Sequence, residues 1–213
     1  MANERGIDAA VFDWGGVITV SVPTFIDAWL HGEGIDRERY GVTMKSWLGR
    51  DAAPDNPVAR LETGELPVAE FERLLAAELV TLDGREVASR DLLRRMFGTA
   101  HPDPAMVDLV RELRAAGVRT ALLSNSWGDG YPEDLLLELF DTIVISGRVG
   151  LRKPDPRIFA HTVERLGLPA GRCAFFDDMP VNVEAADAAG LRAHRHTDAA
   201  ATRAVLTDLG VLA

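Results

Sequence analysis

The sequence predicts an α/β fold: a doubly wound parallel sheet with a helical segment inserted after its first strand. Three observations predict it: short apolar runs that recur along the chain, helical patterns that alternate with them, and one long segment with helical periodicity alone. The chain of 213 residues has room for one well-buried core with an insertion and is short for two full domains. Its hydrophobic fraction of 47% and charged fraction of 26% are ordinary for a packed globular protein.

Continuous apolar runs predict the strands. Four clear runs and one weaker run lie, in chain order, at 9–12, 120–123, 142–145, 173–176 and 191–194. Strands of a parallel sheet are unbroken apolar runs because helices cover both faces, whereas half-exposed strands alternate. The first strand is separated from the second by about a hundred residues, which is where the insertion is expected.

Helical patterns follow the later strands. The clearest places Met106, Leu109, Val110 and Leu113 on one face, and Gly117 is expected to end that helix. Further helices are expected at 132–140, 156–166, 181–189 and 200–209. Helices that alternate with buried strands are typical of a Rossmann-like sandwich.

The inserted segment shows helical periodicity and no convincing strand. We expect residues 1–19 and 101–213 to form the core domain and residues 20–100, called here the helical insert, to form a second unit. Its aromatic and methionine residues are interpreted as packing, with a substrate pocket as the alternative: Phe25, Trp29, Tyr40, Met44 and Trp47. Its basic residues are interpreted as solvated, with an anion site as the alternative: Arg37, Arg39 and Arg50.

Charge and cysteine content limit the classes of function. The net charge is −10 and no run of Lys and Arg is long enough to follow a phosphate backbone, so nucleic acid is not expected as a partner. No apolar stretch approaches the roughly 20 residues that cross a bilayer, and the N-terminus lacks the pattern of an export signal, so no membrane association is expected. The single Cys173 lies in an apolar run and favours a cytoplasmic location.

Polar residues follow four of the predicted strands. Asp13 follows the first strand, Ser124-Asn125 the second, Lys153 the third, and Asp177-Asp178 the fourth. Ligands of open parallel sheets bind beyond the carboxyl ends of the strands, so these side chains are expected to meet at one edge. Carboxylates placed so close together repel one another unless a cation neutralises them, and oxygen ligands favour Mg²⁺.

These residues, in this order, resemble the four motifs of the haloacid dehalogenase superfamily. The resemblance spans nearly the whole chain, and its motifs are DWGGV at 13–17, LLSN at 122–125, GLRKPDPRIF at 150–159 and FFDDMPVN at 175–182. The helical insert lies where the first subfamily carries its helical C1 cap. The resemblance therefore implies a hydrolase whose insert covers the site as a lid.

The resemblance also implies a role for each motif residue. Asp13 would be the nucleophile and would form an aspartyl-phosphate. Mg²⁺ would be held by the carboxylates of Asp13 and Asp178 and by the backbone carbonyl of Gly15. Asp177 would bind the metal directly or through water.

The remaining motif residues would bind the phosphoryl group. Lys153 would neutralise its oxygens, with the Ser124 hydroxyl and the Asn125 backbone N–H as hydrogen-bond donors. Gly16 would allow backbone amides to approach the phosphate, and Asn182 would orient the last motif. The implied partner is a small phosphorylated metabolite, and the protein is expected as a monomer or homodimer.

Gly15 departs from the family pattern. Phosphatases of the superfamily commonly carry a second Asp there, which protonates the leaving group and activates water. Such acid–base help is typically worth about 10²–10⁴-fold. The favoured interpretation is a phosphatase that uses a good leaving group or takes its acid from elsewhere, with His31 and Asp129 as candidates.

Three alternatives remain at this point. A 2-haloacid dehalogenase needs no such acid, but the clustered pair Asp177-Asp178 argues against it. A phosphonate-cleaving enzyme would need a lysine of the insert, where Lys45 is the only one. The third alternative belongs to a different class of function: a non-catalytic or weakly catalytic regulatory protein that binds a phosphometabolite or a protein partner.

Overall fold

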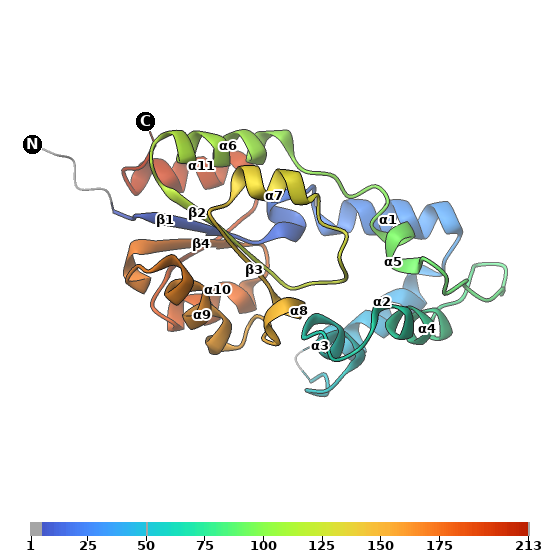
Figure 1. The fold of residues 1–213 in the computed structure, drawn as a ribbon. Coiled ribbons are helices and arrows are strands. Elements are labelled where there is room, and N and C mark those ends of the chain that lie inside the picture. The colour runs from blue at the N-terminus through green and yellow to red at the C-terminus, as the bar shows by residue number, and fades with distance from the viewer. Residues whose placement is uncertain (1–5, 50, 213) are drawn as a thin grey trace, which may run out of the picture.

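The computed structural model describes residues 6–49 and 51–212, and a five-stranded parallel sheet lies at its centre (Figure 1). The strand order is β3-β2-β1-β4-β5. The strands are β1 (Ala9–Phe12), β2 (Arg119–Ser124), β3 (Thr142–Ile145), β4 (Cys173–Asp177) and β5 (Arg192–Arg195). All five were predicted, with bounds that differ by no more than one residue.

The chain fills the sheet outward from β1 on both sides, so the strand order reverses between β1 and β4. β1 pairs with β2 and β4 in register, with Phe12 opposite Leu122 on one side and Phe176 on the other. The pairing extends one residue beyond β1, because the Asp13 backbone N–H donates to the Phe176 carbonyl at 3.0 Å. The doubly wound α/β prediction is confirmed, and the reversal places Asp13 where ligands of such sheets bind.

Helices cover both faces of the sheet (Figure 1). One face carries α6 (Pro104–Ala115), α7 (Glu133–Leu139) and α11 (Ala199–Asp208); the other carries α8 (Ser146–Val149), α9 (Pro156–Leu166), α10 (Pro180–Ala188) and the 3-10 turn η2 (Ala170–Arg172). The four residues of the expected apolar stripe of α6, between Met106 and Leu113, are each no more than 1% exposed. Gly117 follows this helix with φ 76°, the left-handed conformation expected of a residue that ends it.

Alternate residues of each strand contribute to two separate cores. In β1, Ala10 and Phe12 pack into the core beneath α6 and α11, whereas Ala9 and Val11 face the core of α9 and α10. Every residue of β1 is fully buried, which explains why its sequence is an unbroken apolar run. Because both faces are covered, only the ends of this strand are open to a ligand.

The helical insert forms a third hydrophobic cluster of its own. Its helices are α1 (Val22–Glu33), α2 (Arg37–Leu48), α3 (Pro57–Glu62), α4 (Val68–Glu78) and α5 (Leu92–Met96), and its described residues form isolated bridges but no strand. Phe25 and Trp29 are 2% and 5% exposed, as the packing interpretation expects. The division into domains at residues 20 and 100 stays a prediction.

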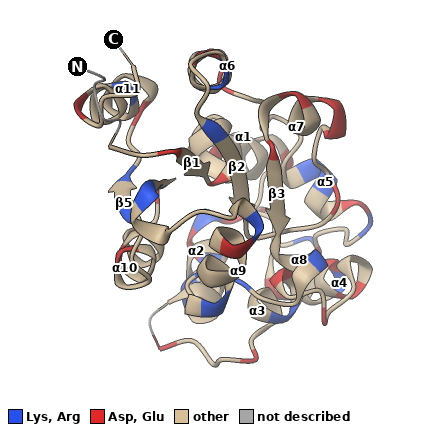
Figure 2. Ribbon diagram, turned by 60° about the vertical axis from the view of Figure 1, so that its left-hand side comes forward, with Lys and Arg blue, Asp and Glu red and all other residues tan. Residues whose placement is uncertain are grey.

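Charged residues are spread over the core and the insert, with basic and acidic positions interspersed (Figure 2). Arg37 pairs with Asp27 at 2.7 Å and Arg39 with Glu78 at 3.2 Å, so both arginines have partners within the insert. The third basic residue considered for an anion site, Arg50, lies outside the described residues. Over the described part of the chain, every helix is too short or too polar to cross a bilayer.

Candidate active site

Three carboxylates lie together at the carboxyl ends of β1 and β4, and we call Asp13, Asp177 and Asp178 the carboxylate cluster. Asp13 follows β1 directly, Asp177 is the last residue of β4, and Asp178 comes next. One oxygen of each lies within 4.8 Å of the others. The parallel pairing of β1 with β4 brings these residues together although about 160 positions separate them in the sequence.

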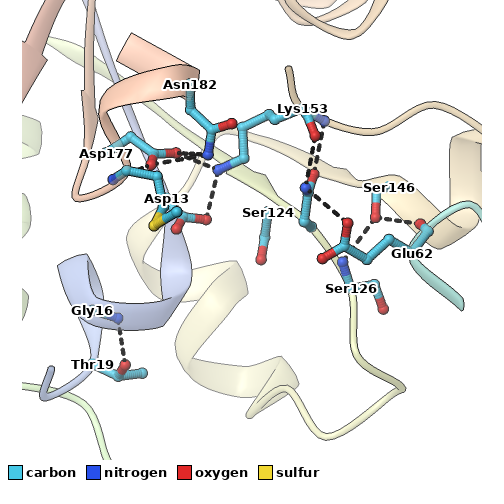
Figure 3. A network of polar contacts seen from close by, with 12 residues as sticks. Asp13, Gly16, Thr19, Glu62, Ser124, Ser126, Ser146, Lys153, Asp177 and Asn182 are labelled. Atoms are coloured by element: carbon cyan, nitrogen blue, oxygen red, sulfur yellow. Dashed lines mark hydrogen bonds and ion pairs between the residues drawn. The ribbon is translucent and has the colours of Figure 1, made fainter. Parts of the chain in front are cut away.

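Lys153 enters the same site from the segment between β3 and α9 (Figure 3). Its ammonium nitrogen lies 2.8 Å from Asp13 Oδ1 and 2.6 Å from Asp177 Oδ2, and its side chain is only 1% exposed. A buried ammonium group is stable only when it is paired, and here two carboxylates pair with it. The structure thus brings together Asp13, Lys153 and Asp177.

The two acids of the last motif have different surroundings. Asp177 is fully buried, and besides Lys153 it accepts hydrogen bonds from the Met179 backbone N–H at 2.9 Å and from Asn182 Nδ2 at 3.0 and 3.1 Å. Asp178 is only partly buried. Asp177 therefore fixes the lysine and the start of α10, whereas Asp178 has more access to a ligand.

The excess of acids over bases shows in the pKa values. Burial raises the pKa of Asp13 to about 7; Lys153 opposes this shift, and the charges of Asp177 and Asp178 add to it. Burial and the neighbouring charge of Asp177 also raise the pKa of Asp178. Burial disfavours the charged form of Lys153, but attraction to Asp13 and Asp177 outweighs it and holds the pKa of Lys153 above its ordinary value.

This donor set fits a hard divalent cation. The carboxylate cluster offers three oxygen ligands with excess negative charge, and one lysine does not neutralise it. Mg²⁺ prefers such oxygen ligands and uses few from the protein. The described residues could therefore hold a metal ion, as expected for Asp13 and Asp178; direct ligation by Asp177 competes with the hydrogen bonds that its oxygens already accept.

The two glycines after Asp13, in the short turn η1 (Trp14–Ile18), have different requirements. Gly16 has φ 77°, and a Cβ added there would lie 2.8 Å from Asp178 Oδ2, so a side chain would displace this carboxylate. Gly15 has φ −70° and ψ 118°, which any residue adopts, and its nearest neighbour would be a Val22 methyl group at 3.8 Å. The backbone therefore requires glycine at position 16 and has room for a side chain at position 15.

The Gly16 amide has a partner within the protein. Its N–H donates to Thr19 Oγ1 at 3.0 Å, so this hydrogen bond would have to break for the amide to reach a phosphate (Figure 3). The role of Gly16 in phosphate binding stays a prediction. The absence of a Cβ beside Asp178 is the role that the geometry itself supports.

Ser124, at the end of β2, is 3% exposed and lies 2.9 Å from the hydroxyl of Tyr131. Burial raises the pKa of Tyr131 to about 12, so this phenol remains protonated and can donate to Ser124 Oγ. The Ser124 hydrogen would then be available for another acceptor. The ring of Tyr131 packs against that of Trp14, the residue after Asp13, with 5.8 Å between the ring centroids. Sequence reasoning missed Tyr131 because nothing in its own surroundings marks it as a partner of Ser124.

The Asn125 side chain holds the backbone of Lys153 from both sides. Asn125 Oδ1 accepts from the Lys153 N–H at 2.8 Å, and Asn125 Nδ2 donates to the Lys153 carbonyl at 3.0 Å. The role of the Asn125 backbone N–H as a donor to phosphate stays a prediction. The contacts of the Asn125 side chain are an additional finding. They connect the segment after β2 to Lys153.

The substitutes considered for an acid at position 15 do not lie among the contacts of the cluster. His31 is exposed on α1, and Asp129 is exposed after β2. Lys45, the lysine that phosphonate chemistry would need, is exposed on α2. The described part of the chain therefore places none of these three in contact with Asp13.

Comparisons with known proteins identify relatives of this chain. A family model described as haloacid dehalogenase-like hydrolase matches residues 7–190. Phosphatase MT3486 of Mycobacterium tuberculosis is 33% identical, over 97% of this chain and 95% of its own length. Sesquiterpene phosphatase astK of Aspergillus oryzae is 27% identical, over 94% of this chain and 95% of its own length.

Solved structures share the fold. The HAD family enzyme bt-2542 of Bacteroides thetaiotaomicron, crystallised in complex with magnesium and inorganic phosphate, has a TM-score of 0.59 and 20% identity over 90% of this chain and 94% of that chain. The family match covers most of the chain and includes both strands that carry the carboxylate cluster. This chain belongs to the haloacid dehalogenase-like hydrolase family.

Proposed function

We propose that the protein is a magnesium-dependent phosphatase that acts on a small phosphorylated metabolite through an aspartyl-phosphate on Asp13. The observation that carries the proposal is the placement of Asp13 Oδ1 at 2.8 Å from Lys153 Nζ, within the carboxylate cluster. Relatives that are named phosphatases over nearly the full chain support it. The helical insert would serve as a C1-type cap over this site.

The proposed reaction has two displacements at phosphorus. A carboxylate oxygen of Asp13 attacks, the bond from phosphorus to the ester oxygen breaks, and the departing oxygen takes a proton from solvent or substrate. Water then attacks the aspartyl-phosphate, which releases inorganic phosphate and restores the carboxylate. Lys153 and Ser124 stabilise the phosphoryl oxygens, since phosphoryl transfer depends mainly on positioning and charge.

A bound Mg²⁺, held by Asp13, Asp178 and the Gly15 carbonyl, would supply positive charge to the phosphoryl group and to the carboxylate cluster. The raised pKa of Asp13, about 7, supports this requirement, because it reflects burial beside two further acids. A cation near Asp13 would favour its charged, nucleophilic form. The clustered pair Asp177-Asp178 also argues against a metal-independent dehalogenase, which has no need of it.

Gly15 defines the class of leaving group that suits the site. It offers no proton to the departing oxygen, so phosphorylated compounds with good leaving groups, such as sugar 1-phosphates and acyl phosphates, are the expected substrates. The second displacement lacks the usual water-activating carboxylate as well. We therefore expect a long-lived aspartyl-phosphate.

The test is release of phosphate from acetyl phosphate and p-nitrophenyl phosphate, with Mg²⁺ or with EDTA, by the wild type and by Asp13→Asn. We expect release that requires Mg²⁺ and falls by at least about 10³-fold in the variant, since a covalent nucleophile is removed. A wild type that is inactive on both, and on a panel of phosphometabolites, would leave the binding protein as the better reading. Metal-independent chloride release from 2-chloropropionate would instead identify a dehalogenase.

A further inference from the structure

One contact between the insert and the core is made by a buried carboxylate, that of Glu62, the last residue of α3. Its side chain is 5% exposed, and both of its oxygens accept hydrogen bonds from the core. Trp127 Nε1 donates to Oε1 at 2.8 Å, Asn125 Nδ2 donates to Oε2 at 3.1 Å, and Arg152 Nε also donates to Oε2. We call Glu62 and these three partners the Glu62 junction.

The backbone around Glu62 lies equally close to the core. Ser146 Oγ donates to the Glu62 carbonyl while it accepts from the Ser126 N–H at 2.8 Å (Figure 3). Two residues later Gly64, at φ 77°, would place a Cβ only 2.7 Å from the Gly147 carbonyl oxygen. The turn after α3 therefore packs directly on backbone of the core, and Glu62 directs its carboxylate into that contact.

The Glu62 junction is linked to the reaction site through Asn125. The same Nδ2 group that donates to Glu62 also donates to the Lys153 carbonyl, and the same amide accepts from the Lys153 N–H. Lys153 in turn reaches Asp13 and Asp177 with its ammonium group. Arg152, which precedes Lys153 in the chain, is held by Glu62 as well. Of the three core donors to Glu62, Asn125 therefore hydrogen-bonds to the Lys153 backbone, and Arg152 is the neighbour of Lys153 in the chain.

We infer that Glu62 is a positioning residue through which docking of the helical insert sets the position of Lys153. The inference rests on the proposed function only in that Lys153 acts in catalysis. With the insert docked, Glu62 fixes the Asn125 amide and Arg152, and these hold the backbone of Lys153. With the insert displaced, Asn125, Trp127 and Arg152 lose a common acceptor, and Lys153 loses part of its support.

Glu62→Gln is the variant that tests the inference, because it keeps the size and removes the second acceptor. A glutamine has one oxygen and one NH₂ group, so either Trp127 or the pair Asn125 and Arg152 must face a donor. The matched control is Glu72→Gln in α4. Glu72 is also a buried acid of the insert, at 9% exposed, but its oxygen accepts from the Leu93 N–H at 3.0 Å within the insert.

Two measurements are made on the full chain. Amide hydrogen exchange of the segment 150–157 reports on the Lys153 N–H, and kcat and KM are measured with p-nitrophenyl phosphate and Mg²⁺. We expect exchange in this segment to be about tenfold faster in Glu62→Gln and unchanged in Glu72→Gln. We expect kcat to fall roughly 10–100-fold, as for loss of residues that orient catalytic groups, with Glu72→Gln at the wild-type value.

The outcomes separate this inference from the proposed function. Three results would overturn the inference. Exchange at 150–157 could be unchanged in Glu62→Gln, or it could increase equally in Glu72→Gln. The third is faster exchange in Glu62→Gln with an unaltered kcat, in an enzyme that is active. A wild type that releases no phosphate refutes the proposed function, while the exchange comparison still decides whether Glu62 positions Lys153. If Glu62→Gln does not fold, Glu62→Asp, with the charge kept and the reach shortened, undergoes the same measurements.

Discussion

Two groups of charged residues lie around the neighbouring residues Arg152 and Lys153. One group has more acids than hydrogen-bond donors pair with, and the other has more donors than acids. Lys153 faces the carboxylate cluster, where three acids lie together and the one ammonium group pairs with two of them. Arg152 faces the Glu62 junction, where one acid has three donors. The junction is satisfied by the protein itself, whereas the cluster retains excess negative charge. The difference supports our proposal that the first group binds a cation and our inference that the second holds two parts of the chain together.

The largest difference between the carboxylate cluster and the Glu62 junction is expected when Lys153 and Arg152 are replaced in turn. Lys153→Met should lower the rate of phosphate release by about 10³-fold, because a preorganised donor to the phosphoryl oxygens is lost. Arg152→Met should instead lower the free energy of unfolding by about 3 kcal/mol, the effect of leaving a buried carboxylate without its cation. Kinetics with acetyl phosphate and urea unfolding measure the two effects.

Arg157→Met is the control for this pair of variants. Arg157 pairs with Asp155 at 2.6 Å, but its side chain is 73% exposed, so its loss should leave the free energy of unfolding nearly unchanged. The contrast between cluster and junction would be refuted if Lys153→Met and Arg152→Met reduced activity by the same factor.

A smaller effect is expected from the metal, and it depends on pH. The pKa of Asp13 rises from 3.8 to about 7 on folding, so the folded protein holds this proton more tightly than the unfolded chain does. The contribution of protonated Asp13 to stability is therefore complete below about pH 4 and is lost as the pH rises through about 7. Mg²⁺ competes with the proton, so it should stabilise the protein more at pH 8 than at pH 5.

Thermal unfolding with Mg²⁺ or EDTA measures this effect. Metal at a hundredfold excess over its Kd should contribute about 2.7 kcal/mol at pH 8. Asp178→Asn should lose most of the metal-dependent rise in Tm, and Arg152→Met should retain it, since the junction holds no metal. Equal stabilisation by Mg²⁺ at both pH values would contradict the assignment of the metal to the carboxylate cluster.

The smallest expected change is at Gly15, where the cluster could accept a further acid. Gly15→Asp should fit, because the nearest atom to the added Cβ is 3.8 Å away. It should speed turnover of poor-leaving-group esters by up to about 10²-fold, the lower end of the range for acid–base help. Gly15→Asn, which has the same shape and donates no comparable proton, is the control in assays with an alkyl phosphate. An unchanged rate in folded Gly15→Asp would mean that the acid comes from elsewhere.

The fold could be read largely from local patterns. Buried strands such as β1 are apolar along their whole length, and the helix α6 has its stripe at the expected spacing. Both patterns arise from burial of neighbouring positions in the chain.

The site was recoverable from the sequence only as a set of residues. The motifs nominate Asp13, Lys153 and Asp178, and the structure brings them to one edge of the sheet. Their distances depend on the pairing of β1 with β4, which no local pattern encodes. The different needs of Gly15 and Gly16 likewise appear only in space, since the atom that excludes a side chain at Gly16 belongs to Asp178.

The sequence by itself determined the order of strands and helices along the chain, the existence of the insert and the chemical types of the side chains at the strand ends. Only the tertiary structure decided which charges compensate one another. Glu62 has no local sign of burial, because its partners Trp127 and Arg152 follow 65 and 90 residues later. Electrostatic balance depends on distance in space and on exclusion of water, and chain folding sets both of these quantities.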